Sequence, residues 1–215
     1  MANRRHTLIA REGWLYIAAA LLAGGLLWLL AGPLAATPAA AVALMYLYLY
    51  RDPYRRVPAR PLGVISPIDG TVIAVEKQRD PYLDREAWVL VLRMSPSGVF
   101  SMRAPIEGKV QRNWSEPGFA HWVQTDEQDD IVWEVREAGR VRPRCYVQPG
   151  ERVGQGQRCG FVFRGREMAL YLPVNARVEI EPGQRIVAGE TITATLVHQR
   201  AVGYNDIHTG LVTGH

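Results

Sequence analysis

The segment 160–173, GFVFRGREMALYLP, places two cationic side chains around a glycine, between two apolar runs that resemble strands. Arg164 and Arg166 flank Gly165, and guanidinium groups bind phosphate or carboxylate through paired hydrogen bonds. With Arg103 they are candidates for an anion site. The formal net charge of +4 favours anionic partners such as lipid headgroups, phosphates or nucleic acid.

One histidine has the neighbours that proton transfer requires. His121 is followed within ten residues by four carboxylates, and an imidazole oriented by a carboxylate is an effective general base. A surface histidine beside a solvated acidic loop has the same pattern, and this is the favoured interpretation. The four carboxylates are Asp126, Glu127, Asp129 and Asp130.

Metal binding is not expected. The five histidines are scattered, and no pair has the spacing of a helical zinc motif. The two cysteines, Cys145 and Cys159, are too few for a disulfide framework and lack the company of a CxxC pair. We expect both to be buried and reduced.

Two uncharged segments near the start of the chain predict a helical membrane hairpin over 13–50. Residues 13–31 are about as long as a bilayer-spanning helix. Gly32 and Pro33 break the run, and residues 34–50 are again uncharged. A cleaved signal peptide is the alternative, but the length of the apolar region and its second segment argue against it.

Basic residues lie at both ends of this hairpin. Residues 1–12 form a basic N-terminus and residues 51–60 a basic juxtamembrane linker, so the positive-inside rule places both in the cytoplasm. Arg51, Arg55 and Arg56 follow the hairpin directly, and each cation near an anionic bilayer contributes about 1 kcal/mol. They are candidates for lipid contact, although they are equally explained by topology alone.

Residues 61–197 change to short runs rich in valine and isoleucine, punctuated by glycine and proline, which predicts a β-rich domain. Duplicated turns indicate a sandwich of interlocked β half-motifs, as in biotinyl and lipoyl carrier domains. We expect a mainly β, barrel-sandwich-hybrid-like fold after the hairpin, and a flexible tail over 198–215. The repeats are SPIDGTV (66–72) with APIEGKV (104–110), and PGERVGQGQ (149–157) with PGQRIVAGE (182–190). Candidate strands lie at 70–76, 87–94, 108–114, 130–137, 160–163, 168–173, 176–181 and 191–198.

Six motifs, read in order, resemble the short, membrane-associated form of phosphatidylserine decarboxylase. The likeness covers nearly the whole chain, including the hydrophobic hairpin. Each motif alone is a weak signal, whereas their shared order and spacing are specific. The motifs are RDPYRRVP (51–58), SPIDGTV (66–72), MSPSGVFSMRAPIEGKV (94–110), EPGF (116–119), GERVGQGQRCGFVFRG (150–165) and LYLP (170–173).

This resemblance implies a pyruvoyl enzyme of phosphatidylethanolamine synthesis. In that family the chain cuts itself at a Gly-Ser bond, where the serine hydroxyl attacks the preceding carbonyl, and the serine becomes an N-terminal pyruvoyl group. The ketone then forms a Schiff base with the amine of phosphatidylserine. It acts as an electron sink while carbon dioxide leaves.

Three positions depart from the family pattern. The FGSR segment of the family aligns with residues 164–167, so the self-cleaving serine after Gly165 falls on Arg166, which offers no hydroxyl. The pattern MSPFDVHVNRAP becomes MSPSGVFSMRAP, with Gly98 where an aspartate is expected and Phe100 where a histidine is expected. Neither replacement transfers a proton. No Gly-Ser dipeptide occurs anywhere in the chain.

We therefore expect a bacterial-type inner-membrane protein with its β-rich domain on the cytoplasmic side. By family it belongs to phospholipid synthesis, but it does not process itself, forms no pyruvoyl cofactor and is catalytically impaired, with lipid binding retained. The expected partner is membrane phospholipid, with phosphatidylserine the first candidate. A homo-oligomer or a partner enzyme stays open, and nucleic acid is not expected.

Two other functions stay open. The first is an active phosphatidylserine decarboxylase that uses an atypical site. The second is a membrane-anchored carrier or adaptor module. Against a carrier, Lys77 and Lys109 lack the flanking methionines or the acid-lysine-alanine setting of a modified lysine. Against an adaptor, the chain shows no coiled-coil heptads.

Overall fold

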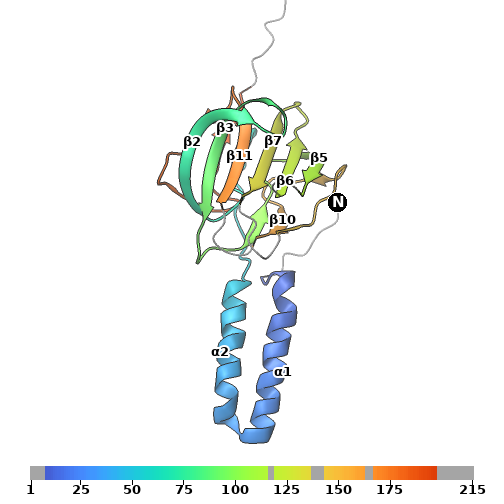
Figure 1. Cartoon of the computed structure of the whole chain (residues 1–215), viewed down its shortest axis with the longest axis vertical. Coiled ribbons are helices and arrows are strands. Elements are labelled where there is room, and N and C mark those ends of the chain that lie inside the picture. The colour runs from blue at the N-terminus through green and yellow to red at the C-terminus, as the bar shows by residue number, and fades with distance from the viewer. Residues whose placement is uncertain (1–7, 116–118, 137–142, 163–166, 198–215) are drawn as a thin grey trace, which may run out of the picture.

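A helix pair stands at one end of a β-rich domain in the computed structural model (Figure 1). The structure describes residues 8–115, 119–136, 143–162 and 167–197. The predicted mainly β fold with a helical hairpin in front of it is confirmed. The predicted tail at 198–215 lies outside the described residues.

The helix pair forms where the sequence breaks between its two apolar segments. A 3-10 turn, η1 (Arg11–Gly13), leads into α1 (Trp14–Ala31), and α2 (Pro33–Leu49) returns beside it. Gly32 makes the turn with a φ of 84°, a left-handed conformation that glycine adopts without a steric penalty. Pro33 opens α2, where the missing N–H costs no hydrogen bond.

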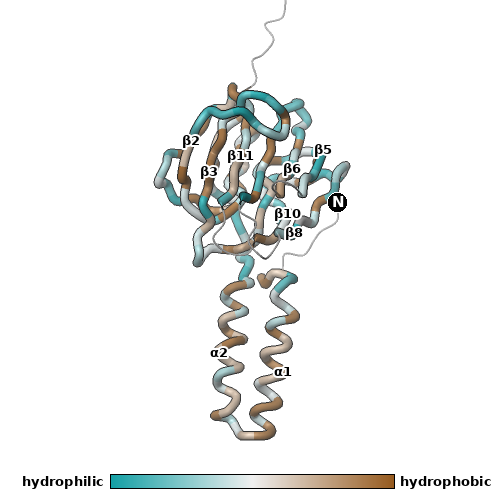
Figure 2. Tube along the Cα trace, viewed as in Figure 1, coloured by the Kyte–Doolittle hydropathy of each residue, from teal (hydrophilic) through white to brown (hydrophobic). Residues whose placement is uncertain are grey.

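Both helices consist largely of apolar residues (Figure 2), and many of their side chains are exposed. Residues 11–31 are long and apolar enough to cross a membrane, whereas α2 is a shorter apolar helix. Leu22, Leu29 and Leu34 are 76%, 85% and 84% exposed. Burying such surface stabilises it by about 25 cal/mol per Å², so this surface indicates association with a membrane.

An eight-stranded, antiparallel and strongly curled sheet forms most of the domain (Figure 1). Its strands follow the order β13-β2-β3-β11-β7-β6-β5-β9. Two small sheets, β1-β14-β12 and β4-β10-β8, complete the domain. The strands of the large sheet are β2 (Gly70–Asp80), β3 (Arg85–Met94), β5 (Gly108–Trp114), β6 (Phe119–Gln124), β7 (Asp130–Val135), β9 (Arg152–Val153), β11 (Glu167–Pro173) and β13 (Arg185–Ile186). Those of the small sheets are β1 (Gly63–Ile65), β4 (Ser101–Arg103), β8 (Arg144–Cys145), β10 (Arg158–Phe161), β12 (Arg177–Val178) and β14 (Ile192–Thr195).

Apolar residues alternate between the two faces of the large sheet, because successive side chains of a strand point to opposite sides. On β3, Leu90 and Leu92 belong to the main core, whereas Val89 belongs to a second cluster. The second cluster combines small residues such as Ala120 with the large ring of Tyr171. The main core therefore lies on one face of the sheet, and a smaller apolar cluster lies on the other.

The predicted internal repeat has a structural basis in two equivalent glycines. Gly70 opens β2 and Gly108 opens β5, and each strand carries a register shift after its next valine. A Cβ on Gly70 would lie 2.0 Å from the carbonyl oxygen of Arg93, and one on Gly108 would lie 2.4 Å from that of Gln124. Each glycine therefore lets the neighbouring strand approach closely.

The second pair of repeats completes this pattern. The strand in each PG segment pairs with the glycine that opens the long strand, as Gly70 pairs with Ile186 and Gly108 with Val153. The two halves interlock, because the amide of Arg103 donates to the carbonyl of Pro67 (3.0 Å). Sequence repetition thus indicated a duplicated half-motif, and the hydrogen bonds place the two halves together.

The structure also contains strands that the sequence did not indicate. The main omission is β6 (Phe119–Gln124), which joins β5 to β7 in the large sheet. Its sequence, FAHWVQ, lacks a clean alternation because a buried histidine occupies one of the inward positions. The sequence pattern instead favoured a surface position for His121, beside an acidic loop.

Candidate functional site

The loop that carries two of the degenerate family positions is held by one carboxylate. Oδ2 of Asp69 accepts hydrogen bonds from the amide of Val99 (3.0 Å) and from Nη2 of Arg55 (2.8 Å), and Oδ1 accepts from the amide of Ala188 (2.8 Å). Asp69 lies in the SPIDGTV motif, whose repeat partner Glu107 is exposed. Sequence reasoning treated this motif as a repeated turn and as one of the family motifs, but it did not single out Asp69.

Gly98 packs directly against this carboxylate. A Cβ at Gly98 would lie 2.9 Å from the Cβ of Asp69 and 3.2 Å from that of Ser95. The aspartate that the family resemblance places at this position does not fit the present backbone without a shift. The carboxylate at this point of the fold is therefore supplied by Asp69, on a different segment.

Phe100 is part of the hydrophobic core. Its side chain is 1% exposed and meets the ring of Phe161 edge to face, with centroids 6.3 Å apart. Phe161 in turn stacks on Tyr50 at the end of α2, at 5.6 Å. Where the resemblance places an imidazole, the chain has an aromatic contact that joins the domain to the helix pair.

The remaining family positions, Gly165 and Arg166, lie outside the described residues, as does Arg164. Their flanks are described, since the amide of Val162 donates to the carbonyl of Phe100 (2.9 Å). The residues present do not fit a self-generated pyruvoyl group, because position 166 has no hydroxyl and Phe100 is a buried hydrocarbon ring.

His121 is buried, so the interpretation as a surface histidine is wrong. It lies on β6 with 0% exposure, and its Nδ1 is 2.8 Å from Oδ1 of Asn113. Two of the nearby acids have other partners, since Asp126 pairs with Arg152 (2.8 Å) and Asp130 accepts from Nε1 of Trp122 (2.9 Å). The cross-strand pairing of β6 with β5 and β7 turned this side chain inward.

Burial lowers the pKa of His121 from its ordinary value of 6.5 to about 4. The unfolded chain therefore binds this proton at a higher pH than the folded chain does. The free energy of unfolding therefore does not depend on this residue's proton above about pH 6.5. It decreases as the pH falls from 6.5 toward 4, and the decrease is about 2 kcal/mol at pH 5. We expect His121→Met to remove this part of the pH dependence.

The measurement compares the free energy of unfolding at pH 7 and pH 5 for the wild type and for His121→Met, both in detergent. The free energy of unfolding should fall from pH 7 to pH 5 by about 2 kcal/mol more in the wild type than in the variant. Equal differences would mean that His121 ionises in the folded protein as readily as in the unfolded one.

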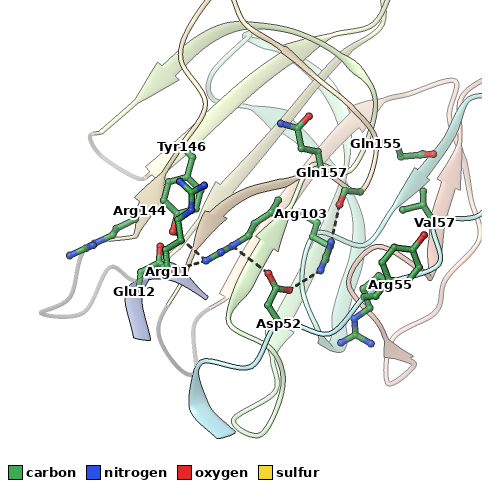
Figure 3. A pocket seen from close by; sticks show the side chains of 13 residues that line it. Arg11, Glu12, Asp52, Arg55, Val57, Arg103, Arg144, Tyr146, Gln155 and Gln157 are labelled. Carbon is green, nitrogen blue, oxygen red and sulfur yellow. Dashed lines mark hydrogen bonds and ion pairs between the residues drawn. The ribbon is translucent and has the colours of Figure 1, made fainter. Parts of the chain in front are cut away.

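A cavity of about 870 Å³ lies where the helix pair meets the domain (Figure 3). Its wall is formed by η1, the segment after α2 and the small sheet that contains β4, β8 and β10. Five arginines and two carboxylates line it, together with neutral polar groups. The charged residues are Arg11, Arg55, Arg103, Arg144, Arg158, Glu12 and Asp52.

Asp52 is the centre of a buried ion cluster in this wall (Figure 3). It is 3% exposed, and its Oδ1 accepts a hydrogen bond from Nη2 of Arg103 at 2.8 Å. Its Oδ2 lies 3.6 Å from Nε of Arg158, which also pairs with Glu12 at 2.7 Å. The cluster therefore joins η1, the segment after α2 and the domain by charge.

The structure brings only some of the predicted anion-binding arginines to this cavity. Arg55 and Arg103 line it, each already paired with an aspartate. Arg51 instead donates to the carbonyls of Tyr48 and Ser97, and Arg56 is exposed. None of these four is therefore a freely available cation within the cavity.

Three further lining arginines were not among the predicted anion-binding residues. Arg11 counted only toward membrane topology, Arg144 stands in no recognised motif, and Arg158 lies in the 150–165 motif but was given no role there. A local signal for them is lacking, because Arg158 and its partner Glu12 are 146 residues apart in the sequence. Their association is a property of the fold.

The structure tests the predictions on the cysteines and on metal binding only for the residues that it describes. Cys159 is buried, as predicted, and its Sγ donates to the carbonyl of Met102 at 3.5 Å, whereas the side chain of Cys145 lies outside the description. Among the described residues, no group of three or more histidine, cysteine, aspartate or glutamate side chains is placed to hold a metal ion.

Comparisons with known proteins identify the family. The family model described as phosphatidylserine decarboxylase matches residues 42–194. A phosphatidylserine decarboxylase proenzyme of Nitrosomonas europaea is 37% identical over 207 residues, which cover 88% of this chain and 95% of the relative. One of Cupriavidus pinatubonensis is 37% identical over 212 residues, which cover 90% and 98%.

A solved structure, the glucose permease IIA of Mycoplasma capricolum, covers 62% of this chain and 94% of its own at 18% identity, with a TM-score of 0.44. That likeness is too low to support an argument. The family match extends over most of the chain, and the curated relatives align along nearly their whole length. The chain therefore belongs to the phosphatidylserine decarboxylase family.

Proposed function

We propose that this protein is a membrane-associated member of the phosphatidylserine decarboxylase family that stays a single uncleaved chain and does not decarboxylate phosphatidylserine. The observation that carries the proposal is the identity of residue 166. Self-cleavage requires a side-chain oxygen at that position, and arginine has none.

The described neighbours support the same proposal. Phe100 fills with hydrocarbon the position where the family resemblance expects a proton-transferring imidazole. Gly98 is packed so closely against Asp69 that a second carboxylate does not fit there without a backbone shift. Substitution at three positions removes the nucleophile and two of the groups that would move protons, whereas the turns that build the fold are kept.

The proposed site of action is the inner surface of a bacterial-type membrane, with phospholipid as partner. The exposed apolar length of α1 and α2 supports contact with lipid tails. Arg51 and Arg56 directly after α2 support a cytoplasmic position for the domain. Phosphatidylserine is the first headgroup to test, because the relatives are named for it.

The test is the intact mass of the full chain, purified in detergent from its membrane fraction. We expect one species of 24.0 kDa that neither reacts with a hydrazide probe for ketones nor releases carbon dioxide from phosphatidylserine. The proenzyme of Nitrosomonas europaea, prepared in the same way, serves as the control for detecting cleavage.

Cleavage of the chain into two fragments near residue 166, with a carbonyl group on the new N-terminus, would contradict the proposal. Release of carbon dioxide from phosphatidylserine by that preparation would establish an active decarboxylase. An intact chain with a modified lysine at position 77 or 109 would instead favour the carrier alternative. An intact, unmodified chain without decarboxylation supports the proposed function.

A further inference from the structure

The cavity at the junction of the helix pair and the domain has more cationic than anionic groups. Asp52 and Glu12 lie against Arg103 and Arg158, and Arg55 pairs with Asp69 at 2.8 Å. The two remaining arginines make no ion pair with any residue in the described ranges. These are Arg11 and Arg144, which lie toward Glu12 and Tyr146 rather than toward Arg55 (Figure 3).

Three guanidinium nitrogens are buried behind this wall. The Nε atoms of Arg55, Arg103 and Arg158 are closed to solvent, and none donates a hydrogen bond within the described part of the chain, although Nε of Arg158 lies 3.6 Å from Oδ2 of Asp52. The side chains of Arg11 and Arg144 are exposed. These two are therefore the guanidinium groups, without an ion pair in the described ranges, that a ligand in the cavity reaches directly.

Neutral side chains extend this donor-rich wall. The hydroxyl of Tyr146 lies 3.5 Å from Nη2 of Arg158, whose guanidinium carbon lies 5.3 Å from the centre of the tyrosine ring. Gln155 and Gln157 also line the cavity. A phosphate ester offers acceptor oxygens only, and arginine binds it in the bidentate geometry of the guanidinium fork.

The position of the cavity relates it to the membrane. Arg11 lies in η1, immediately before α1, and Asp52 follows α2 by three residues. The cavity therefore lies at the ends of α1 and α2 that meet the domain, and Figure 1 shows this junction. With these helices in a bilayer, its wall is at the depth of the lipid headgroups.

We propose that this cavity binds the phosphate of an anionic phospholipid headgroup, with Arg11 and Arg144 as its charged contacts. Arg158 and Arg103 complete the wall, held in place by Asp52 and Glu12. The inference rests on the membrane association proposed above, but not on the absence of self-cleavage. It gives a place and a chemical class to a lipid partner that the sequence alone assigned to other arginines.

In the test, each of three ligands is titrated into the full chain in a neutral detergent, and calorimetry measures the binding. The ligands are short-chain phosphatidylserine, short-chain phosphatidylcholine and inorganic phosphate. The cavity variant is the double substitution Arg11→Gln and Arg144→Gln, both at exposed side chains. The control is Arg177→Gln with Arg185→Gln, which removes the same charge from exposed arginines outside the cavity. Thermal midpoints show whether each variant is folded.

We expect one equivalent of phosphatidylserine to bind more tightly than either phosphatidylcholine or inorganic phosphate. The cavity variant should weaken this binding about tenfold or more for each guanidinium removed, whereas the control variant binds as the wild type does. Equal loss in both variants would mean diffuse charge attraction and would overturn the site. Inorganic phosphate bound as tightly as the lipid would overturn the headgroup assignment, and no binding would overturn both.

The intact mass is measured on the same preparation, which separates the two proposals. A cleaved chain that binds lipid in an Arg11- and Arg144-dependent manner contradicts the proposed function and leaves this site standing. An intact chain that binds none of the three ligands does the opposite.

Discussion

Replacing Asp52 with alanine is expected to lower the free energy of unfolding by about 3–5 kcal/mol. The carboxylate is 3% exposed and lies against both Arg103 and Arg158. Its loss leaves Arg103 with only the carbonyl oxygens of Gly156 and Pro53. A buried cation without its counter-ion is far less stable than the pair, which explains the size of the expected effect.

Thermal unfolding of the full chain in detergent measures this loss, because each kcal/mol shifts the midpoint of a chain this long by about 2–4 °C. Asp126→Ala is the matched control. That aspartate also pairs with an arginine, Arg152 at 2.8 Å, but both side chains are largely exposed, and we expect no change in the midpoint. A shift for Asp52→Ala no larger than that of the control would show that the cluster does not stabilise the junction.

The Asp52 cluster also bears on the proposed headgroup site. It fixes the positions of Arg103 and Arg158 in the wall of the cavity, while the helix pair and the domain contribute opposite sides of the cluster. Asp52→Asn keeps the size of the side chain but removes its charge. This variant separates the shape of the junction from its electrostatic contribution.

Phe100→Ala is expected to destabilise the protein by about 3–5 kcal/mol, the usual effect of truncating a buried phenylalanine. The ring is 1% exposed and touches Phe161, which stacks on Tyr50. Removing it opens a void in the aromatic contact between the domain and the helix pair. Chemical or thermal unfolding in detergent measures the loss.

Two further variants at position 100 distinguish between two roles of this residue, a side chain of the core and a replaced catalytic side chain. Phe100→Leu keeps the apolar character and should lose less than about 1.5 kcal/mol. Phe100→His, which restores the residue that the family resemblance expects, buries a polar ring and should lose more than the leucine variant. If the histidine variant is as stable as the wild type, the position is still built for an imidazole, and its assignment to the core is wrong.

If the protein is inactive as proposed, single restorations are not expected to give catalysis. An aspartate at Gly98 collides with Asp69, and a histidine at Phe100 enters an apolar cluster. Arg166→Ser restores a hydroxyl but none of the groups that would remove its proton. The surroundings of Gly98 and Phe100 are thus packed for the side chains that are present.

Local residue patterns determined much of the architecture in advance. Uncharged segments of sufficient length on both sides of Gly32 predicted the helix pair. Length and apolar composition are local properties, so they can be read from the sequence without knowledge of tertiary contacts. The repeated proline-acid-glycine turns predicted the duplicated half-motif, because only glycine permits the close strand approach at Gly70 and Gly108. The sequence also decided that residue 166 has no nucleophilic oxygen, because that depends on side-chain identity alone.

Tertiary structure alone decided which charged and polar groups meet. His121 is buried because β6 pairs on both sides within the large sheet, whereas the acids that follow it in sequence suggested a surface loop. The arginine-lined cavity joins Arg11 to Arg144 and Arg158, which are more than 130 positions away along the chain. Many arginines in this sequence have the same local character, so only the path of the backbone determines which of them share a wall.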